Sequence, residues 1–143
     1  MSRVTYDTNV LIRFRPAHYP AGFFMSAVVV QELTAGAKDA AHMQVFEQLW
    51  RDFEARDRLL VPNGEDWWFT GKILSSLRRG LRSHRAGRTS AISAEEQQRI
   101  VRDVLIARSA KRINAVVVTE NVADFEKIRR FCNVRIVRPA HYF

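Results

Sequence analysis

The sequence predicts a three-layer α/β/α fold, with helices on both faces of a central parallel sheet of about four to five strands. Three observations predict this class. Short apolar runs alternate with stretches of helical periodicity, the connections between them are short, and residues 115–118 are apolar without interruption. Alternation of strands and helices favours parallel pairing, and a continuous apolar run is typical of a strand covered on both faces.

The expected elements follow in order from the N-terminus. Strand-like runs end at polar or turn-forming residues and occupy residues 3–7, 22–25, 59–61, 115–118 and 134–137. Apolar residues at helical spacing indicate helices over residues 9–14, 26–36, 39–56, 65–81, 94–111 and 121–131. Ser26 and Ser93 are the expected N-caps of two of these helices. Residues 81–93 are rich in Gly, Ser, Arg and Thr, which predicts a loop.

The composition is that of one globular domain spanning residues 1–143, with 47% hydrophobic and 27% charged residues. No run approaches the roughly 20 apolar residues that span a membrane. Asp7 and Asn9 interrupt the region that would be apolar in a signal peptide, so we expect a cytoplasmic protein with no membrane partner. Cys132 is the only cysteine; it cannot form an internal disulfide and is expected to be buried.

The charge balance favours a polyanionic partner. Lys and Arg number 23 against 15 acidic residues, which gives a net charge of +8, and most of the basic residues are arginines. The planar guanidinium group suits phosphate better than an ammonium group does. A basic surface that only keeps the protein soluble is the alternative explanation of the same composition.

Acidic and polar side chains follow two of the predicted strands. Asp7 comes at the end of the first strand, whereas Thr119 and Asn121 follow the fourth strand and Asp124 lies within the next helical turn. In open α/β sheets, functional sites gather beyond the C-terminal ends of the strands. The two groups can therefore form one site if these strands are neighbours in the sheet.

Two further carboxylates are candidates for the same site. Glu32 lies among apolar and small residues on the helix after the second strand, and Asp103 lies at the margin of the apolar face of a later helix. An acid at such a margin needs a partner to offset its desolvation. Spacing forces no lysine or arginine into that place, although Arg99 lies four residues before Asp103. Each of the four acids taken singly has another explanation, as a partly exposed helix residue or as a charge favoured at a helix N-terminus.

A divalent cation would offset several of these acids at once. Four converging carboxylates suit a hard cation with oxygen ligands, Mg²⁺ or Mn²⁺, which can neutralise a phosphate and activate water. Zinc is disfavoured because the sequence has one cysteine and its four histidines show no ligand spacing.

The same residues resemble the signature of a known family, the PIN-domain nucleases, and within it the VapC-type toxins. The opening stretch YDTNVLI resembles the Asp-Thr/Ser-Asn signature, and TENVADF resembles the final Thr-x-Asn-x-x-Asp-Phe signature. Glu32 in VVVQELTAG and Asp103 in RDVLIA match the second and third acids of the family. The matching positions lie in the family's order between residues 4 and 125.

The resemblance implies a Mg²⁺- or Mn²⁺-dependent endoribonuclease, the toxin of a type II toxin–antitoxin pair. It also implies RNA as the substrate, a cognate antitoxin as partner, and a homodimer. The metal site that it implies consists of Asp7, Glu32, Asp103 and Asp124, with Asp7 and Asp103 as the most direct ligands. The residues that it assigns to positioning these acids or the waters of the metal are Thr8, Thr119 and Asn121. One position departs from the pattern, because Arg102 stands where many relatives have a neutral residue such as Asn.

Residues 72–88 are the expected RNA contact, because this stretch contains six Lys and Arg residues and no acid. The alternatives for the same stretch are a solvated charged loop and a docking surface for an acidic antitoxin. The adjacent Trp67 and Trp68 point about 100° apart on a helix, so at most one of them is expected to be fully buried.

Two rivals to the ribonuclease remain. The first is a catalytically silent PIN-like module that binds nucleic acid or antitoxin; its signature would be the loss of one of the four acids, and all four are present. The second is a Mg²⁺-dependent phosphotransfer or phosphatase domain, which would need a lysine near a later strand end. None of the four lysines is expected in such a place.

Overall fold

The structure, a computed structural model, describes residues 2–84 and 92–143, with the backbone alone for residues 81–84. In these ranges the strands are β1 (Val4–Tyr6), β2 (Met25–Ser26), β3 (Leu59–Leu60), β4 (Val116–Val118) and β5 (Ile136–Val137). Each of them lies within a predicted strand-like run or overlaps one. β-branched and other apolar residues dominate these strands, in keeping with their burial.

The central sheet is parallel, as predicted. Its three strands lie in the order β1-β4-β5, and β2 pairs with β3 in a second parallel ladder. A single bridge between Val4 and Phe23 connects the two ladders, so the five strands do not form one continuous sheet. The backbones approach closely at this bridge, because a Cβ on Gly22 would lie 2.1 Å from the carbonyl oxygen of Ser2. Only glycine fits such an approach.

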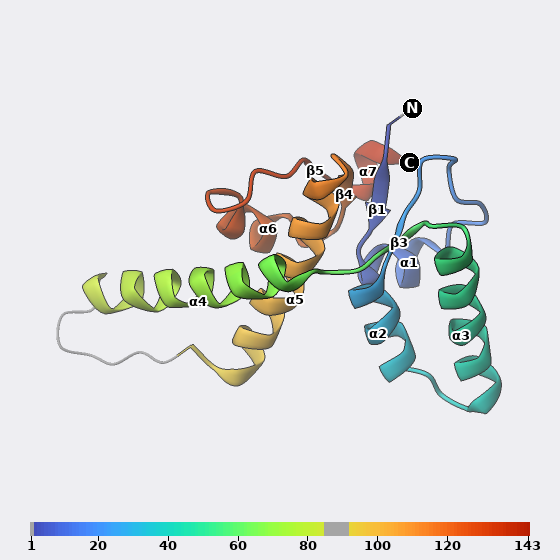
Figure 1. Ribbon diagram of the computed structural model, residues 1–143, viewed down its shortest axis with the longest axis horizontal. Helices are drawn as coiled ribbons and strands as arrows, with labels where there is room; N and C mark the ends of the chain where they lie inside the picture. Colours follow the sequence, from blue (N-terminus) through green and yellow to red (C-terminus); the bar gives the residue numbers. More distant parts are fainter. Residues whose placement is uncertain (1, 85–91) are drawn as a thin grey trace.

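The helices lie on both sides of the strands. Within the described ranges they are α1 (Thr8–Phe14), α2 (Ala27–Ala35), α3 (Ala40–Ala55), α4 (Gly64–His84), α5 (Ala94–Arg112), α6 (Val122–Arg129) and α7 (Pro139–Tyr142). Figure 1 shows α4, α5 and α6 on one side of the sheet and α2 and α3 on the other. The three-layer arrangement is therefore the predicted one.

Side-chain caps set the starts of several helices. Ser26 accepts a hydrogen bond from the backbone N–H of Val28 at the start of α2, and Ser93 accepts one from Glu96 at the start of α5. The predicted loop over residues 81–93 is wrong at its start, because α4 continues to His84; residues 85–91 lie outside the described residues. None of the helices in the described ranges has the length and apolar character needed to cross a membrane.

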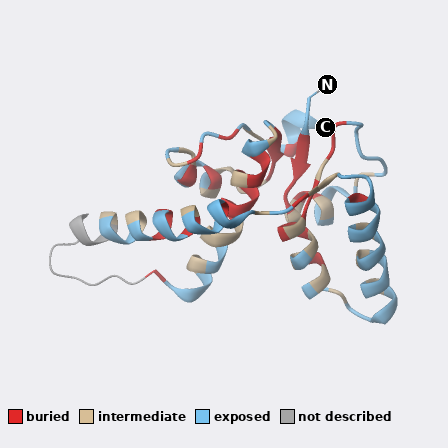
Figure 2. Cartoon of the chain, viewed as in Figure 1, coloured by how far each residue is buried: buried red, intermediate tan, exposed pale blue. Residues whose placement is uncertain are grey.

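The core lies between the two helical layers, where buried residues cluster along the strands and the inner helix faces (Figure 2). Its largest fully buried side chains include Tyr6, Met25, Ile106 and Phe125. Cys132 is buried as predicted. Burial of these side chains against one another is the main stabilising contribution to the fold.

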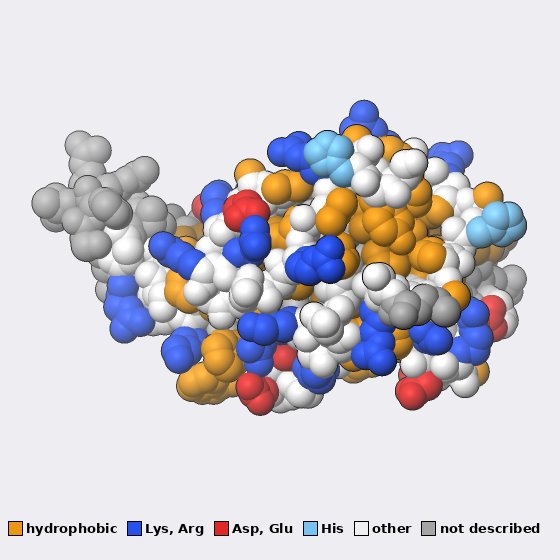
Figure 3. All heavy atoms as spheres, turned by 90° about the horizontal axis from the view of Figure 1, so that it is seen from above, with side chains coloured by type: hydrophobic (Ala, Val, Ile, Leu, Met, Phe, Trp, Pro, Cys, Tyr) orange, Lys and Arg blue, Asp and Glu red, His pale blue; other side chains and the backbone are white. Residues whose placement is uncertain are grey.

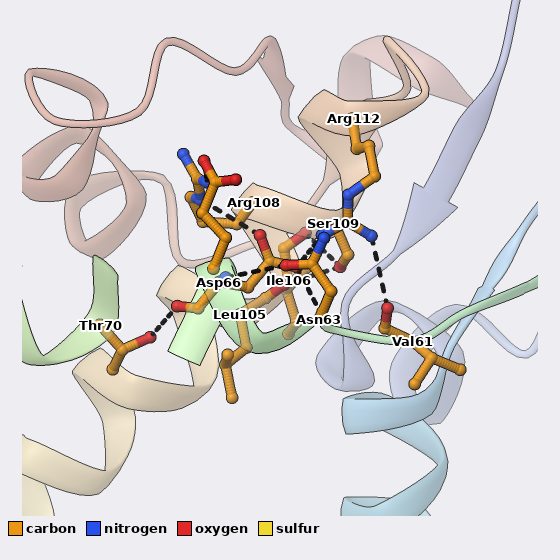
Figure 4. Close-up of polar contacts among 10 residues, drawn as sticks. Val61, Asn63, Asp66, Thr70, Leu105, Ile106, Arg108, Ser109 and Arg112 are labelled. Atoms are coloured by element: carbon orange, nitrogen blue, oxygen red, sulfur yellow. Dashed lines mark hydrogen bonds and ion pairs between the residues drawn. The ribbon is translucent and has the colours of Figure 1, made fainter. Parts of the chain in front are cut away.

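A buried ion-pair network joins α4 to α5 (Figure 4). Asp66, only 1% exposed, accepts hydrogen bonds from Arg108 Nε at 3.2 Å and from an Arg112 guanidinium nitrogen. It also forms a reciprocal cap with Asn63, each accepting from the backbone N–H of the other. Because α5 also carries Asp103, this network helps to hold that residue in place. Sequence periodicity gave no sign of it.

Candidate functional site

The two groups of polar residues after the first and fourth strands meet in the structure. β1 and β4 are adjacent and parallel, with Tyr6 opposite Val118, so the residues that follow them lie at the same edge of the sheet. The hydroxyl of Thr119 donates a hydrogen bond to Asp7 Oδ2 over 2.7 Å. Both residues are buried. The condition that the sequence left open, that these two strands are neighbours, is therefore met.

Hydrogen bonds hold Asp7 in one orientation. Asp7 is the N-cap of α1: its Oδ1 accepts from the backbone N–H of Thr8 at 2.8 Å, and the Asn9 amide approaches Oδ2 at 3.3 Å. Asn9 in turn accepts from the backbone N–H of Glu120 at 3.3 Å. Together with the hydrogen bond from Thr119, these donors hold the buried carboxyl group of Asp7 at a fixed position.

Glu32 joins the same site from α2. Its Oε1 accepts from the Thr8 hydroxyl at 3.0 Å, and its Oε2 accepts from Arg102 Nη1 at 2.8 Å. Burial raises the pKa of Glu32 above its usual value, while Arg102 and Thr8 act in the opposite direction and nearby Asp7 adds to the rise. Thr8 thus connects the two acids, donating to Asp7 through its backbone and to Glu32 through its side chain.

Asp103 is the most deeply perturbed acid of the site. It is 2% exposed, and its Oδ1 lies 3.4 Å from Arg102 Nε. Burial raises the pKa of Asp103 from 3.8 to about 7, with Arg102 opposing the rise and the charges of Asp7 and Asp124 adding to it. The arginine therefore offsets the burial of this carboxyl group only in part.

Asp124 lies near Asp103, in the lining of the same hollow. The two acids line a hollow of about 160 Å³ together with Glu96, Arg99 and Lys127. Lys127 Nζ lies 3.9 Å from Asp124 Oδ1. Lys127 lies within α6 and not at the end of a strand, as expected from the sequence. The lysine pairs with Asp124, whereas a phosphotransfer domain would need it at the nucleophilic acid after the first strand.

Asn121 contributes to the site through its backbone. The backbone N–H of Asn121 donates to the Thr119 hydroxyl at 3.0 Å, which turns that hydroxyl toward Asp7. Asn121 is the N-cap residue of α6, but its side chain makes no cap hydrogen bond there. The turn after β4 therefore orients Thr119.

The donor set fits a hard divalent cation in its chemistry. Every candidate ligand is a carboxylate, and the raised pKa of Asp103 marks a buried acid that lacks full charge compensation. Within the described residues, however, no three Asp, Glu, His or Cys side chains are gathered closely enough to hold one ion together. Arg102 contacts Glu32 and Asp103 at the same time and supplies the positive charge between them.

Arg102 is the site residue that sequence reasoning missed. Helical spacing offers Arg99, four positions before Asp103, as the nearest basic residue. The partner is instead the preceding residue, whose long side chain reaches back to Asp103 and across to Glu32 on α2. The departure from the family pattern at this position was the available signal.

Basic side chains are not confined to the site. Figure 3 shows Lys and Arg side chains spread over the face at the top of Figure 1, with few acids among them. On α4, Lys72 lies over the rings of Trp68 and Phe69, and Arg78 donates to Gln97. Residues 85–88 of the predicted RNA contact, and the side chains of 82 and 84, lie outside what the structure describes. The contact with RNA stays a prediction.

Comparison with known proteins then places the fold. No protein-family profile matches the chain, and no curated protein matches it significantly. DNA-bound VapBC from Salmonella typhimurium is similar over 96% of this chain and 98% of that chain, with 24% identity and a TM-score of 0.59. The chain has a PIN-like α/β/α fold.

Other solved structures agree with this PIN-like fold. VapBC-1 from nontypeable Haemophilus influenzae is 24% identical with a TM-score of 0.57, over 94% of this chain and 96% of that chain. FitAcB from Neisseria gonorrhoeae is 19% identical with the same TM-score of 0.57, over 96% of this chain and 99% of that chain. The similarity covers nearly the whole length of each chain, so the acids described above lie within the shared fold.

Proposed function

We propose that this protein is a Mg²⁺- or Mn²⁺-dependent endoribonuclease of the VapC type, the toxin of a toxin–antitoxin pair. One observation carries the proposal: the buried hydrogen bond between Thr119 and Asp7 joins the two family signatures at the C-terminal edge of a PIN-like sheet. Glu32 approaches the same point through Thr8, and Asp103 and Asp124 approach it from α5 and α6.

The cation would be held by carboxylates from four elements. Its ligands would come from Asp7, Glu32, Asp103 and Asp124. When bound, Mg²⁺ or Mn²⁺ supplies positive charge that polarises a phosphodiester and makes a water molecule a better nucleophile. Without that charge, several acids at one edge of the sheet would repel the RNA backbone.

The residues of the chain itself have separable roles. Thr119, Thr8 and Asn9 orient the Asp7 carboxylate, so that its lone pairs point in fixed directions. The backbone N–H of Asn121 keeps the Thr119 hydroxyl turned toward that carboxylate. We assign the Asn121 side chain, which caps no helix here, to hydrogen bonding with waters or substrate at the site. Preorganised groups of this kind need not reorganise during the reaction.

An open groove beside the site suits a single strand of RNA. It has a volume of about 720 Å³, reaches Glu32 and Arg102, and is lined by residues that include Gln31, Trp67 and Arg99. Trp67 is 57% exposed, and an exposed aromatic ring can stack on a base whatever its sequence. Glutamine amides can hydrogen bond to base edges, and Arg99 can contact phosphate.

A second groove, mostly apolar, suits the antitoxin. It has a volume of about 540 Å³ between α1, α2 and α3, and its lining includes Leu11, Ile12, Val45 and Phe46. Ile12 and Val45 are well exposed, which is costly unless a partner covers them. The similar solved structures include VapBC assemblies, which supports a two-protein arrangement for this chain as well. We also propose that the toxin forms homodimers.

A catalytically silent PIN-like module is the second candidate. The observation that favours it is the guanidinium group of Arg102, which occupies two of the acids needed for the metal. A silent module would bind nucleic acid or antitoxin and would show no metal-dependent cleavage.

RNA cleavage by purified protein, with and without EDTA, tests the proposal. The double variant Asp7→Asn/Asp103→Asn should lose metal-dependent cleavage by at least about a hundredfold while its circular dichroism spectrum stays unchanged. Asp52→Asn, an exposed acid on α3, is the matched control and should cleave like the wild type. Undiminished cleavage by a folded double variant would reject this site. Absence of cleavage and of metal binding in the wild type would favour the silent module.

A further inference from the structure

We infer that Arg102 is a built-in competitor of the metal ion: its guanidinium group holds Glu32 and Asp103 until a divalent cation displaces it. This inference rests on the proposed function and concerns the regulation of the same site. It makes the metal-free form a closed resting state, in which the chain itself neutralises part of its acid cluster.

The contacts of Arg102 are those of a cation in the centre of the site. Nη1 lies 2.8 Å from Glu32 Oε2, and Nε lies 3.4 Å from Asp103 Oδ1. One guanidinium group thus joins α2 to α5 across the cluster. Its side chain is 26% exposed, which makes it less screened by water than a surface arginine.

These contacts use the oxygen atoms that a metal would need. Both oxygens of Glu32 are occupied, Oε1 by the Thr8 hydroxyl and Oε2 by Arg102. Oδ1 of Asp103 faces Arg102 as well. A divalent cation that binds Glu32 Oε2 or Asp103 Oδ1 must therefore compete with a charged contact at the same oxygen. It must also enter where a positive charge already stands, which costs further Coulomb energy.

The displaced side chain has a place to go. Arg102 lines the groove of about 720 Å³ between α2 and α5, with Gln31, Gln98 and Arg99 around it. Arginine is long and flexible, and both of its acid contacts come from the same planar group. A change of side-chain rotamer can therefore release both acids without a backbone movement. In the groove the freed guanidinium group would lie where we propose that the RNA strand runs, as a ligand for phosphate.

Competition of this kind has a measurable size. If the open form is a small fraction of the metal-free protein, the apparent dissociation constant for the metal rises by the inverse of that fraction. An open fraction of about 1–10% gives an affinity lowered by about 10- to 100-fold. A variant that lacks the guanidinium charge should bind the metal more tightly by the same factor.

Mn²⁺ binding, followed by calorimetry and by the electron paramagnetic resonance signal of free Mn²⁺, tests the inference without any activity assay. The variants are Arg102→Gln and, as a matched control, Arg99→Gln. Arg99 lies one helical turn away and lines the same groove and the acidic hollow, so its loss removes the same charge nearby. Arg102→Lys keeps the charge but cannot span both acids with a planar fork, and it serves as a second variant if Arg102→Gln does not fold.

We expect Arg102→Gln to bind Mn²⁺ at least about tenfold more tightly than the wild type, with Arg102→Lys in between and Arg99→Gln within about threefold of the wild type. If the wild type binds Mn²⁺ measurably and both Arg102 variants bind it equally or more weakly, the inference about Arg102 is overturned and the proposed function still stands. An equal gain from Arg99→Gln would overturn it too, since general charge would then explain the effect. Absence of Mn²⁺ binding in the wild type and in every variant would overturn both this inference and the proposed function.

Discussion

The pH dependence of stability should report directly on the buried acid Asp103. Its pKa is 3.8 in an unfolded chain and about 7 in the folded protein, chiefly because burial disfavours the charged form. The folded state therefore binds this proton more tightly than the unfolded state. The stability due to this group is complete below about pH 4 and is lost as the pH rises through about 7. A pKa difference of this size corresponds to about 4 kcal/mol at full ionisation.

The variant Asp103→Asn cannot ionise and should escape this loss. We expect the metal-free variant to be more stable than the wild type at pH 8 by about 2–4 kcal/mol, with the difference shrinking steadily toward pH 4. Urea unfolding in EDTA at several pH values between these limits measures the difference. The Asn side chain has nearly the same shape, so packing changes contribute little.

Asp52→Asn on the exposed face of α3 is the control for a change from Asp to Asn at the surface. The free energy of unfolding of this variant should differ little from that of the wild type, and the difference should not change with pH. For Asp103→Asn, the difference in free energy of unfolding from the wild type should instead change with pH. A difference that stays constant with pH, or that grows toward low pH, would refute the reasoning. In that event Arg102 would compensate Asp103 fully, and the acid would be ionised in the metal-free protein.

Three further substitutions test the contributions of buried polar groups to stability, each measured by urea unfolding at pH 7. Thr119→Val removes the donor to Asp7 and should cost about 1–3 kcal/mol, whereas Thr5→Val should be neutral or stabilising. The two differ because the Thr5 hydroxyl is buried without a hydrogen-bond partner in the described part of the chain; equal effects would contradict this explanation. Asp66→Asn breaks the buried network between α4 and α5 and should cost about 3–5 kcal/mol. A cost below about 1 kcal/mol would mean that solvent screens this network.

Much of the architecture could be predicted from local pattern. Strand and helix positions follow from apolar periodicity and from caps such as Ser26 and Ser93, because these signals act over a few residues. Element boundaries differ from this pattern in two places. Helix α4 extends three residues beyond its predicted end, and the helix α7 is too short to show a periodicity in the sequence. The division of the strands into two ladders depends on pairing between residues far apart in the chain, which no local pattern encodes.

For the candidate site, the sequence by itself determined which acids are available and that Asp7 and Thr119 follow strands. Only the tertiary structure decided that these strands are neighbours, because strand order depends on pairing between residues more than a hundred positions apart. It also decided that Arg102 reaches both Glu32 and Asp103. A charge–charge contact between two helices depends on their packing and on one side-chain rotamer, and neither is written in the spacing of residues along the chain.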